Sequence, residues 1–413
     1  MTTSTPQDNN DTKTTWDHLV YIRLFEGCNL NCEHCFIPSN PKKIDLSFYK
    51  DNGLANTLKA YTTIKPNESV LLQWHGGEPT MLGTSYLNEA ITLTEKDTTF
   101  NFIHSIQTNL MNFHESPSQW AEIYHKYFNS QIGVSWDYGI RHVKRNKTSE
   151  ETNKEYELKF WQNHEIARSF GLNMYFVITV TKLFFEKYKN PLDFFEFIVS
   201  KGVTHLNFER ITNNGNAREN WGKLGLNNLE YSENMSKFFK YYRLFKQNNP
   251  NIKLNISPFD GLYLSVSNLD RHIYNQKTIG ISDVLSFKNQ GYGCWSGSCD
   301  TKFHTIDSNG YKHGCTALTS EQDNNNKMLQ HNIQNKKIVW LGKSNLEQQE
   351  NILSYRAERQ RSCQECEFLT ICSSGCLSVD KFDESGECSG AKKLFTTIRD
   401  TYTKGSKSPT LIK

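Results

Sequence analysis

The sequence predicts an α/β protein: a partial (β/α)6 barrel of the TIM type, followed by a small cysteine-rich domain. Between Leu19 and Glu209, six short β-rich segments alternate with longer helical patterns. This alternation is typical of a parallel sheet with right-handed crossovers. All but three of the eleven cysteines lie beyond residue 290, which indicates a separate cysteine-rich unit after the barrel.

The predicted strands are short runs rich in β-branched and aromatic residues. They are Leu19–Phe25, Ser69–Trp74, Asn101–Thr108, Gln131–Trp136, Met174–Val180 and His205–Glu209. Helical patterns lie between them, such as Glu151–Phe170. In a barrel of this kind the functional site lies at the carboxyl ends of the strands. Polar residues directly after each strand are therefore the site candidates.

The chain divides into five predicted parts: a disordered tail (1–16), the barrel (17–211), a bridging helical and irregular region (212–290), the cysteine-rich domain (291–398) and a flexible basic tail (399–413). Within the bridging region, the apolar spacing of Glu233–Gln247 predicts an amphipathic helix that packs in the core. Within the cysteine-rich domain, Asp307-Ser308-Asn309-Gly310 predicts a hairpin between 302–306 and 311–315.

Charge and composition disfavour several protein classes. The 47 basic and 44 acidic residues nearly balance, so a dedicated nucleic-acid binder is not expected. The sequence shows no apolar run long enough to span a bilayer and no secretion signal. We therefore expect a cytoplasmic protein with neither nucleic acid nor membrane as a partner. In a reducing compartment, clustered cysteines more often hold metal than form disulfides.

Cys28, Cys32 and Cys35 follow the first predicted strand with the spacing C-x3-C-x2-C. Three thiolates leave one iron of a [4Fe–4S] cube without a protein ligand, and an open iron can bind and reduce another molecule. The alternative is a zinc site, which requires a fourth ligand. None is near in sequence, and His34 is too close to Cys35 to serve easily.

This triplet at the end of a first barrel strand resembles the radical S-adenosylmethionine (SAM) superfamily. In that family the open iron chelates the amino and carboxylate groups of SAM, and the reduced cluster cleaves SAM to a 5′-deoxyadenosyl radical. His34 stands where the family has an aromatic residue before the third cysteine. The resemblance implies that His34 packs near the adenine.

Further motifs at strand ends extend the resemblance. The second strand ends where the family carries its GGEP motif, which binds the SAM amino group; the matching residues are Gly76, Gly77, Glu78 and Pro79. The alternative is an ordinary turn with Glu78 in the first turn of a helix.

The next two strand ends give weaker matches. Asn109 ends strand three, with Leu110 where relatives have glycine, so we expect an altered turn. Resemblance also assigns Ser135 and Arg145 to the SAM carboxylate or ribose. For each of these two residues alone, a turn or surface role is an equal alternative.

The C-terminal cysteines match the SPASM domain pattern C-x(9–15)-G-x4-C, gap, C-x2-C-x5-C-x3-C, gap, C. Eight thiolates fill two four-cysteine [4Fe–4S] sites, with a pair of zinc knuckles as the alternative. The resemblance implies a first auxiliary cluster on Cys294, Cys299, Cys315 and Cys376. It implies a second on Cys363, Cys366, Cys372 and Cys388. With the triplet, all eleven cysteines are used in three [4Fe–4S] clusters.

Enzymes of this type mostly modify ribosomally made peptides or proteins. The resemblance implies SAM as cofactor, an electron donor such as flavodoxin or ferredoxin, and a precursor peptide or protein substrate. The leader would be recognised by this chain or by a separate recognition protein. Two other classes stay open: a small-molecule radical SAM enzyme, and a non-enzymatic zinc or electron-carrier protein.

One position bears on the reaction. Anaerobic sulfatase-maturing enzymes carry an aspartate base directly after the cysteine of G-x4-C, and here that residue is Thr316. We therefore expect an intramolecular crosslink (cyclophane C–C or thioether), with formylglycine formation or epimerisation as alternatives. The candidate bases, each more often structural or SAM-binding, are His75, Asp137, Glu209 and Asp300.

Overall fold

The computed structural model describes residues 16–37, 42–144, 149–279, 293–298, 301–308, 312–318 and 346–405. Within these ranges, nine strands form one sheet in the order β7-β6-β5-β4-β3-β2-β1-β8-β9. The strands are β1 (His18–Phe25), β2 (Ser69–Gly76), β3 (Asn101–Thr108), β4 (Gln131–Ser135), β5 (Asn173–Val180), β6 (His205–Arg210), β7 (Asn255–Ser257), β8 (Phe303–Ile306) and β9 (Lys312–His313).

The six predicted strands are β1 to β6, and adjacent strands from β1 to β7 are parallel. The sheet is larger than predicted. β7 adds a parallel strand beside β6, and β8 pairs in parallel with β1, with β9 antiparallel to β8. The predicted hairpin therefore belongs to the barrel sheet. Local sequence could not show this, because a hairpin signal does not name the neighbouring strand.

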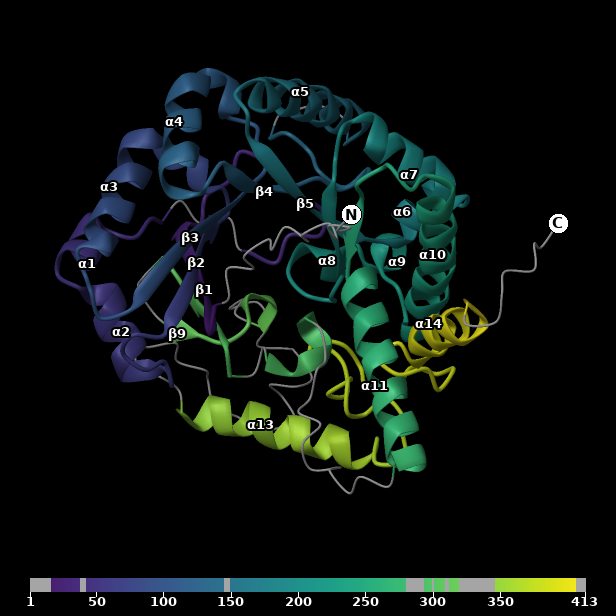
Figure 1. Ribbon diagram of the computed structural model, residues 1–413. Coiled ribbons are helices and arrows are strands. Elements are labelled where there is room, and N and C mark those ends of the chain that lie inside the picture. Colours follow the sequence, from purple (N-terminus) through teal and green to yellow (C-terminus); the bar gives the residue numbers. More distant parts are fainter. Residues whose placement is uncertain are drawn as a thin grey trace, which may run out of the picture.

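Helices follow the strands and cover the outside of the sheet, in the arc that Figure 1 shows for α3, α4, α5 and α7. The α-helices are α1 (Leu46–Lys50), α2 (Gly53–Tyr61), α3 (Gly83–Glu95), α4 (Pro117–Tyr127), α5 (Ser149–Ser169), α6 (Lys182–Lys187), α7 (Pro191–Ser200), α8 (Asn216–Glu219), α9 (Trp221–Leu224), α10 (Asn228–Asn248), α11 (Phe259–Ile279), α13 (Leu346–Arg361) and α14 (Lys392–Gly405). The short 3-10 turns are η1 (Pro79–Leu82), η2 (Phe113–Glu115), η4 (Gly293–Ser296) and η6 (Thr316–Leu318). None of the helices in the described ranges is both long and apolar enough to span a membrane.

Buried and partly accessible side chains alternate along the strands, so that one face of each strand packs in the core and the other faces the barrel interior. In β2, Val70, Leu72 and Trp74 are fully buried, whereas the residues between them are partly accessible. The same period of two holds in β5 and β6. The buried face meets the helices, so the partly accessible residues face the interior. Polar residues on that second face are available for a site.

The predicted helix at Glu233–Gln247 is confirmed as the core of α10. Its apolar face, including Met235, Phe238 and Tyr242, is buried, and Phe238 packs on Phe184 and Phe194 of α6 and α7. Asn227 and Glu230 form a capping box that fixes where the helix begins.

The described part of the bridging region, up to residue 279, contains the helices α8 to α11 and the short strand β7. One boundary predicted from sequence is wrong. Residues 399–405, predicted to belong to a flexible tail, are the last part of α14. Leu394, Phe395 and Ile398 anchor that helix in the core, and the basic residues after them obscured its continuation in the sequence.

Candidate active site at the carboxyl ends of the strands

The loop after β1 brings the three N-terminal thiols together. The Leu30 amide and the Asn109 side-chain amide lie 3.4 and 3.7 Å from Cys28 Sγ, and Arg141 Nη1 lies 3.8 Å from Cys32 Sγ. Burial raises the pKa of Cys28 to about 12, and burial also raises the pKa of Cys32 and Cys35. The charges of the three sulfurs act on one another.

This environment fits a cluster ligand set. Buried thiols with raised pKa values stay protonated unless a cation forms a bond with them. Arg141 and the amides around the loop supply the donors that stabilise anionic sulfur. The three sulfurs do not converge as a metal site, nor does any other group of His, Cys, Asp or Glu in the described ranges, so the fit rests on the burial of the thiols and on these donors.

Glycine is required where the β2 end meets the cysteine loop. A Cβ on Gly77 would lie 2.3 Å from the carbonyl oxygen of Gly27, and a Cβ on Gly76 would lie 2.1 Å from that of Phe25. The close approach is held by hydrogen bonds from the Gly77 and Glu78 amides to these two carbonyls. The predicted Gly-Gly-Glu motif therefore packs directly on the chain that leads to Cys28.

Glu78 is buried and ties the ends of β2 and β3 together. Its carboxylate accepts hydrogen bonds from the Thr80 amide and hydroxyl (3.0 and 2.7 Å), the Thr108 hydroxyl (2.7 Å) and the Asn109 amide (2.7 Å). Burial raises its pKa, and these donors oppose the shift. The Glu78 side chain thus holds the ends of β2 and β3 in a fixed relation. Pro79 begins η1 and is also buried.

The turn after Asn109 keeps a glycine-like backbone without glycine. Leu110 has φ of 63°, in the left-handed region that costs a bulky residue about 1–2 kcal/mol. The Asn163 side chain donates to the Leu110 carbonyl (2.8 Å), and the Leu110 amide donates to Thr108 Oγ1 (3.0 Å). The backbone of Leu110 thus takes a conformation that glycine adopts easily, and the predicted difference of this turn from that of relatives stays a prediction.

His34 and Asp137 belong to one buried ionic group. Asp137 Oδ2 lies 2.6 Å from Arg141 Nε and 3.3 Å from His34 Nε2, and Asp137 Oδ1 accepts the Thr179 amide. Burial lowers the pKa of His34 to about 4, so the imidazole is neutral at pH 7, and its Nδ1 has no hydrogen-bond partner in the described part of the chain. Asp137 is thus engaged in structure, which disfavours it as a base.

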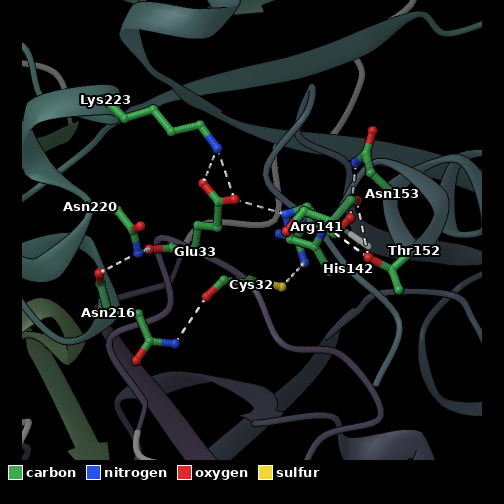
Figure 2. Close-up of polar contacts among 10 residues, drawn as sticks. Cys32, Glu33, Arg141, His142, Thr152, Asn153, Asn216, Asn220 and Lys223 are labelled. Atoms are coloured by element: carbon green, nitrogen blue, oxygen red, sulfur yellow. Dashed lines mark hydrogen bonds and ion pairs between the residues drawn. The ribbon is translucent and has the colours of Figure 1, made fainter. Parts of the chain in front are cut away.

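The cysteine loop is also fixed by residues of α8, α9 and the position between them (Figure 2). Asn216 and Asn220 donate to the carbonyls of Cys32 (3.0 Å) and Glu33 (3.1 Å), and Lys223 pairs with the Glu33 carboxylate at 2.8 Å. His142 contacts the same carboxylate at 3.1 Å. The sequence did not indicate these residues, because they lie more than a hundred positions from Cys32 and Glu33 along the chain.

Other predicted residues face the barrel interior. Ser135 Oγ accepts the Gln107 side-chain amide (2.7 Å). Burial lowers the pKa of His75 to about 4. Glu209 lies on the inner face of β6, where its side chain remains in contact with solvent. Desolvation by the surrounding protein raises its pKa. Asn207 donates to its carboxylate. Arg145, Cys299 and Asp300 lie outside the described residues.

A pocket in the C-terminal region is lined by four cysteines predicted to share one cluster. Its walls include Cys363, Cys366, Cys372 and Cys388, together with Phe368 and Phe395. A Cβ on Gly390 would lie 2.6 Å from Cys372 Sγ, so glycine keeps this cradle open. Four thiols with apolar walls fit a [4Fe–4S] ligand set.

The described members of the other predicted set also lie near one another. Cys294 and Cys376 both act electrostatically on the Tyr231 phenol. Cys315 packs against the small cluster of Ile352 and Leu377, and Leu377 directly follows Cys376. Two buried arginines of α13 fix the intervening loop. Arg356 donates to the carbonyls of Ser373 and Gly375, and Arg359 to those of Ser374 and Val379. These arginines were also missed in the sequence.

Thr316 contacts the barrel through its backbone carbonyl. Its carbonyl accepts Arg23 Nη2 of β1 at 3.2 Å, and the next carbonyl, of Ala317, accepts Asn214 Nδ2 after β6 at 2.7 Å. The turn after Cys315 is therefore attached to β1 and to the loop after β6.

No family model matches the chain. It is 24% identical over 357 residues to the cysteine-type anaerobic sulfatase-maturating enzyme of Clostridium novyi (strain NT), covering 85% of each chain. It is 27% identical over 203 residues to the serine-type enzyme of Bacteroides thetaiotaomicron, covering 46% of each.

Two solved structures share the fold. The structure of anSMEcpe with bound AdoMet and Cp18Cys peptide has a TM-score of 0.61 at 17% identity, over 94% of this chain and 98% of that one. Streptococcus suis SuiB bound to its precursor peptide SuiA has a TM-score of 0.51 at 16% identity, over 88% and 72%.

The cysteine motifs and the match over 85% of both chains support the predicted class, a radical SAM enzyme of the SPASM type. Within that class it is a homologue of the anaerobic sulfatase-maturating enzymes.

Proposed function

We propose that this enzyme abstracts a hydrogen from a side chain of a peptide or protein substrate and oxidises it, forming an intramolecular crosslink. The homology over 85% of both chains carries the proposal of a peptide or protein substrate. Cys28, Cys32 and Cys35 would hold the SAM-binding cluster. Asn109, Ser135 and the backbone of Gly76 and Gly77 would line the SAM site.

When bound, a [4Fe–4S] cluster with an open iron supplies the electron that cleaves SAM to a 5′-deoxyadenosyl radical. The chain itself must orient the target C–H and exclude water. The Asp137–Arg141 ion pair, which Arg141 Nη1 joins to Cys32 Sγ and the neutral His34 contacts through Asp137, helps to fix the loop. The eight C-terminal cysteines would hold two auxiliary clusters that accept the substrate electron.

Oxidation also releases a proton, and Glu209 is the best candidate to accept it. Its carboxylate is accessible from the barrel interior and has a raised pKa, whereas Asp137 is engaged by Arg141 and His34. His75 is a weaker candidate, because its lowered pKa makes it a poor base. Glu209→Gln should reduce product formation by about 10²–10⁴-fold and leave 5′-deoxyadenosine formation in place.

Formylglycine formation is the second candidate, because both curated relatives are sulfatase-maturating enzymes. The residue after Cys315 disfavours it, since a threonine hydroxyl is a far weaker base than a carboxylate.

Mass spectrometry separates these outcomes. The enzyme is reconstituted with iron and sulfide and given SAM, a reductant and cysteine-containing peptides, including any encoded beside the gene. A crosslink gives a loss of two hydrogens without aldehyde reactivity, and formylglycine gives a product that reacts with hydrazides. Unchanged mass with deuterium uptake would indicate epimerisation. No 5′-deoxyadenosine under any condition would contradict the proposal.

A further inference from the structure

Arg210, at the end of β6, is one of the barrel residues that contact the C-terminal cysteine region. Side chains alternate along β6, so Glu209 faces the interior and Arg210 faces outward. Arg210 Nη2 donates to Asn228 Oδ1 (2.8 Å), and Nη1 lies 3.4 Å from the Ser389 carbonyl. The guanidinium also stacks on Tyr231, 4.5 Å from the ring centroid.

The Ser389 carbonyl near Arg210 Nη1 directly follows Cys388, a predicted ligand of the second auxiliary cluster. The thiols of Cys376 and Cys388, the phenol of Tyr231 and the carboxylate of Asp383 all act electrostatically on this guanidinium, and Cys294 acts on Tyr231. Arg210 Nε is buried and has no hydrogen-bond partner among the described residues. Its hydrogen-bond acceptors are a carbonyl and an amide oxygen, so the buried positive charge has no carboxylate bonded to it there.

We propose that Arg210 is a positioning residue that raises the reduction potential of an auxiliary cluster by placing a permanent positive charge beside the backbone that carries its predicted ligand Cys388. This rests on the proposed assignment of the eight C-terminal cysteines. Reduction adds one electron to a cluster that is already anionic. A guanidinium in a medium of low dielectric stabilises the more negative, reduced form. Arginine suits this role because it stays protonated.

The test measures potential rather than turnover. In the Cys28/Cys32/Cys35→Ala background only the C-terminal cysteines can bind clusters, and their midpoint potentials are followed by a redox titration with EPR detection. Arg210→Gln should shift a midpoint to a more negative value, and Arg210→Lys should shift it much less. Arg243→Gln is the matched control. Arg243 stacks on Tyr263 at the same 4.5 Å and also has an unpartnered Nε in the described chain.

Several results would overturn the proposal. They are an unchanged midpoint in Arg210→Gln, a folded Arg210→Gln protein that binds no auxiliary iron, or equal shifts in both Arg210 variants. If Arg210→Gln does not fold, Arg210→Lys decides: a midpoint at the parent value supports the charge effect, and a large negative shift contradicts it. A parent protein without any cluster signal would instead contradict the proposed function.

Discussion

Arg23 of the first strand donates a hydrogen bond to the carbonyl of Thr316, 293 positions later in the chain, at 3.2 Å. The same guanidinium lies 3.7 Å from the Glu26 carboxylate. The turn after Cys315 is thus attached to the barrel through its backbone, so the identity of the Thr316 side chain can change without loss of this contact.

Changing Thr316 tests which reaction the site supports. Thr316→Val should keep product formation within about twofold, because the threonine hydroxyl is not expected to act as the base. Thr316→Asp should add a carboxylate at the position used by sulfatase-maturing relatives, and an aldehyde product should become detectable with a cysteine peptide. The readout is hydrazide labelling followed by mass spectrometry. Loss of all product in Thr316→Val, with normal 5′-deoxyadenosine formation, would show that the hydroxyl itself takes part.

Much of the site could be predicted because its signals are local. Cys28, Cys32 and Cys35 have a fixed spacing, and Gly76 to Pro79 follow a recognisable strand. Each of these groups lies within one loop, so the sequence alone brings its members together. The auxiliary cysteines are similar, since four of them line one pocket.

The remaining parts depend on long-range packing. Asn214 and Asn216 donate hydrogen bonds to the carbonyls of Ala317 and Cys32. The sequence around a loop asparagine does not indicate which distant carbonyl it will contact. β7 has three residues, too few to show an alternation. The outward direction of Arg210 requires the register of β6, which appears only when the sheet is assembled.

Gly215 should be essential to the attachment of the cysteine loop. Its φ is 51°, and a Cβ there would lie 2.4 Å from both the Cys35 carbonyl oxygen and Phe36 Cα. Gly215→Ala should destabilise the apo protein by about 1–3 kcal/mol through overpacking and lower its SAM cleavage. Urea unfolding and 5′-deoxyadenosine assays provide the measurements.

Gly222 of α9 supplies the matched control, because a Cβ there meets no atom within 4 Å. Gly222→Ala should leave stability unchanged or raise it by about 0.5–1 kcal/mol. Equal destabilisation in the two variants would contradict the steric explanation.

The two groups of cysteines should separate SAM cleavage from auxiliary iron binding. Full reconstitution should give about twelve irons, from three clusters of four. Changing Cys28, Cys32 and Cys35 to alanine should leave about eight and abolish 5′-deoxyadenosine. Changing Cys363, Cys366 and Cys372 should also remove about four irons while SAM cleavage remains. Iron analysis and chromatography measure both quantities. Zinc in place of iron, or SAM cleavage by the first variant, would contradict the cluster assignment.

Acid should weaken the pairing of β8 with β1 through two stacked histidines. His304 and His18 have ring centroids 5.5 Å apart, and burial lowers the pKa of both, that of His304 to about 3. A folded-state pKa below the unfolded value of 6.5 means that the unfolded chain binds more protons, so stability is present above pH 6.5 and is lost as the pH falls below it. For His304 the loss between pH 6.5 and 5 is about 2 kcal/mol. His304→Gln should reduce this dependence in urea unfolding of the apo protein. His125→Gln, at an exposed position of α4, should retain it, and an unchanged slope in His304→Gln would show that other groups cause the acid sensitivity.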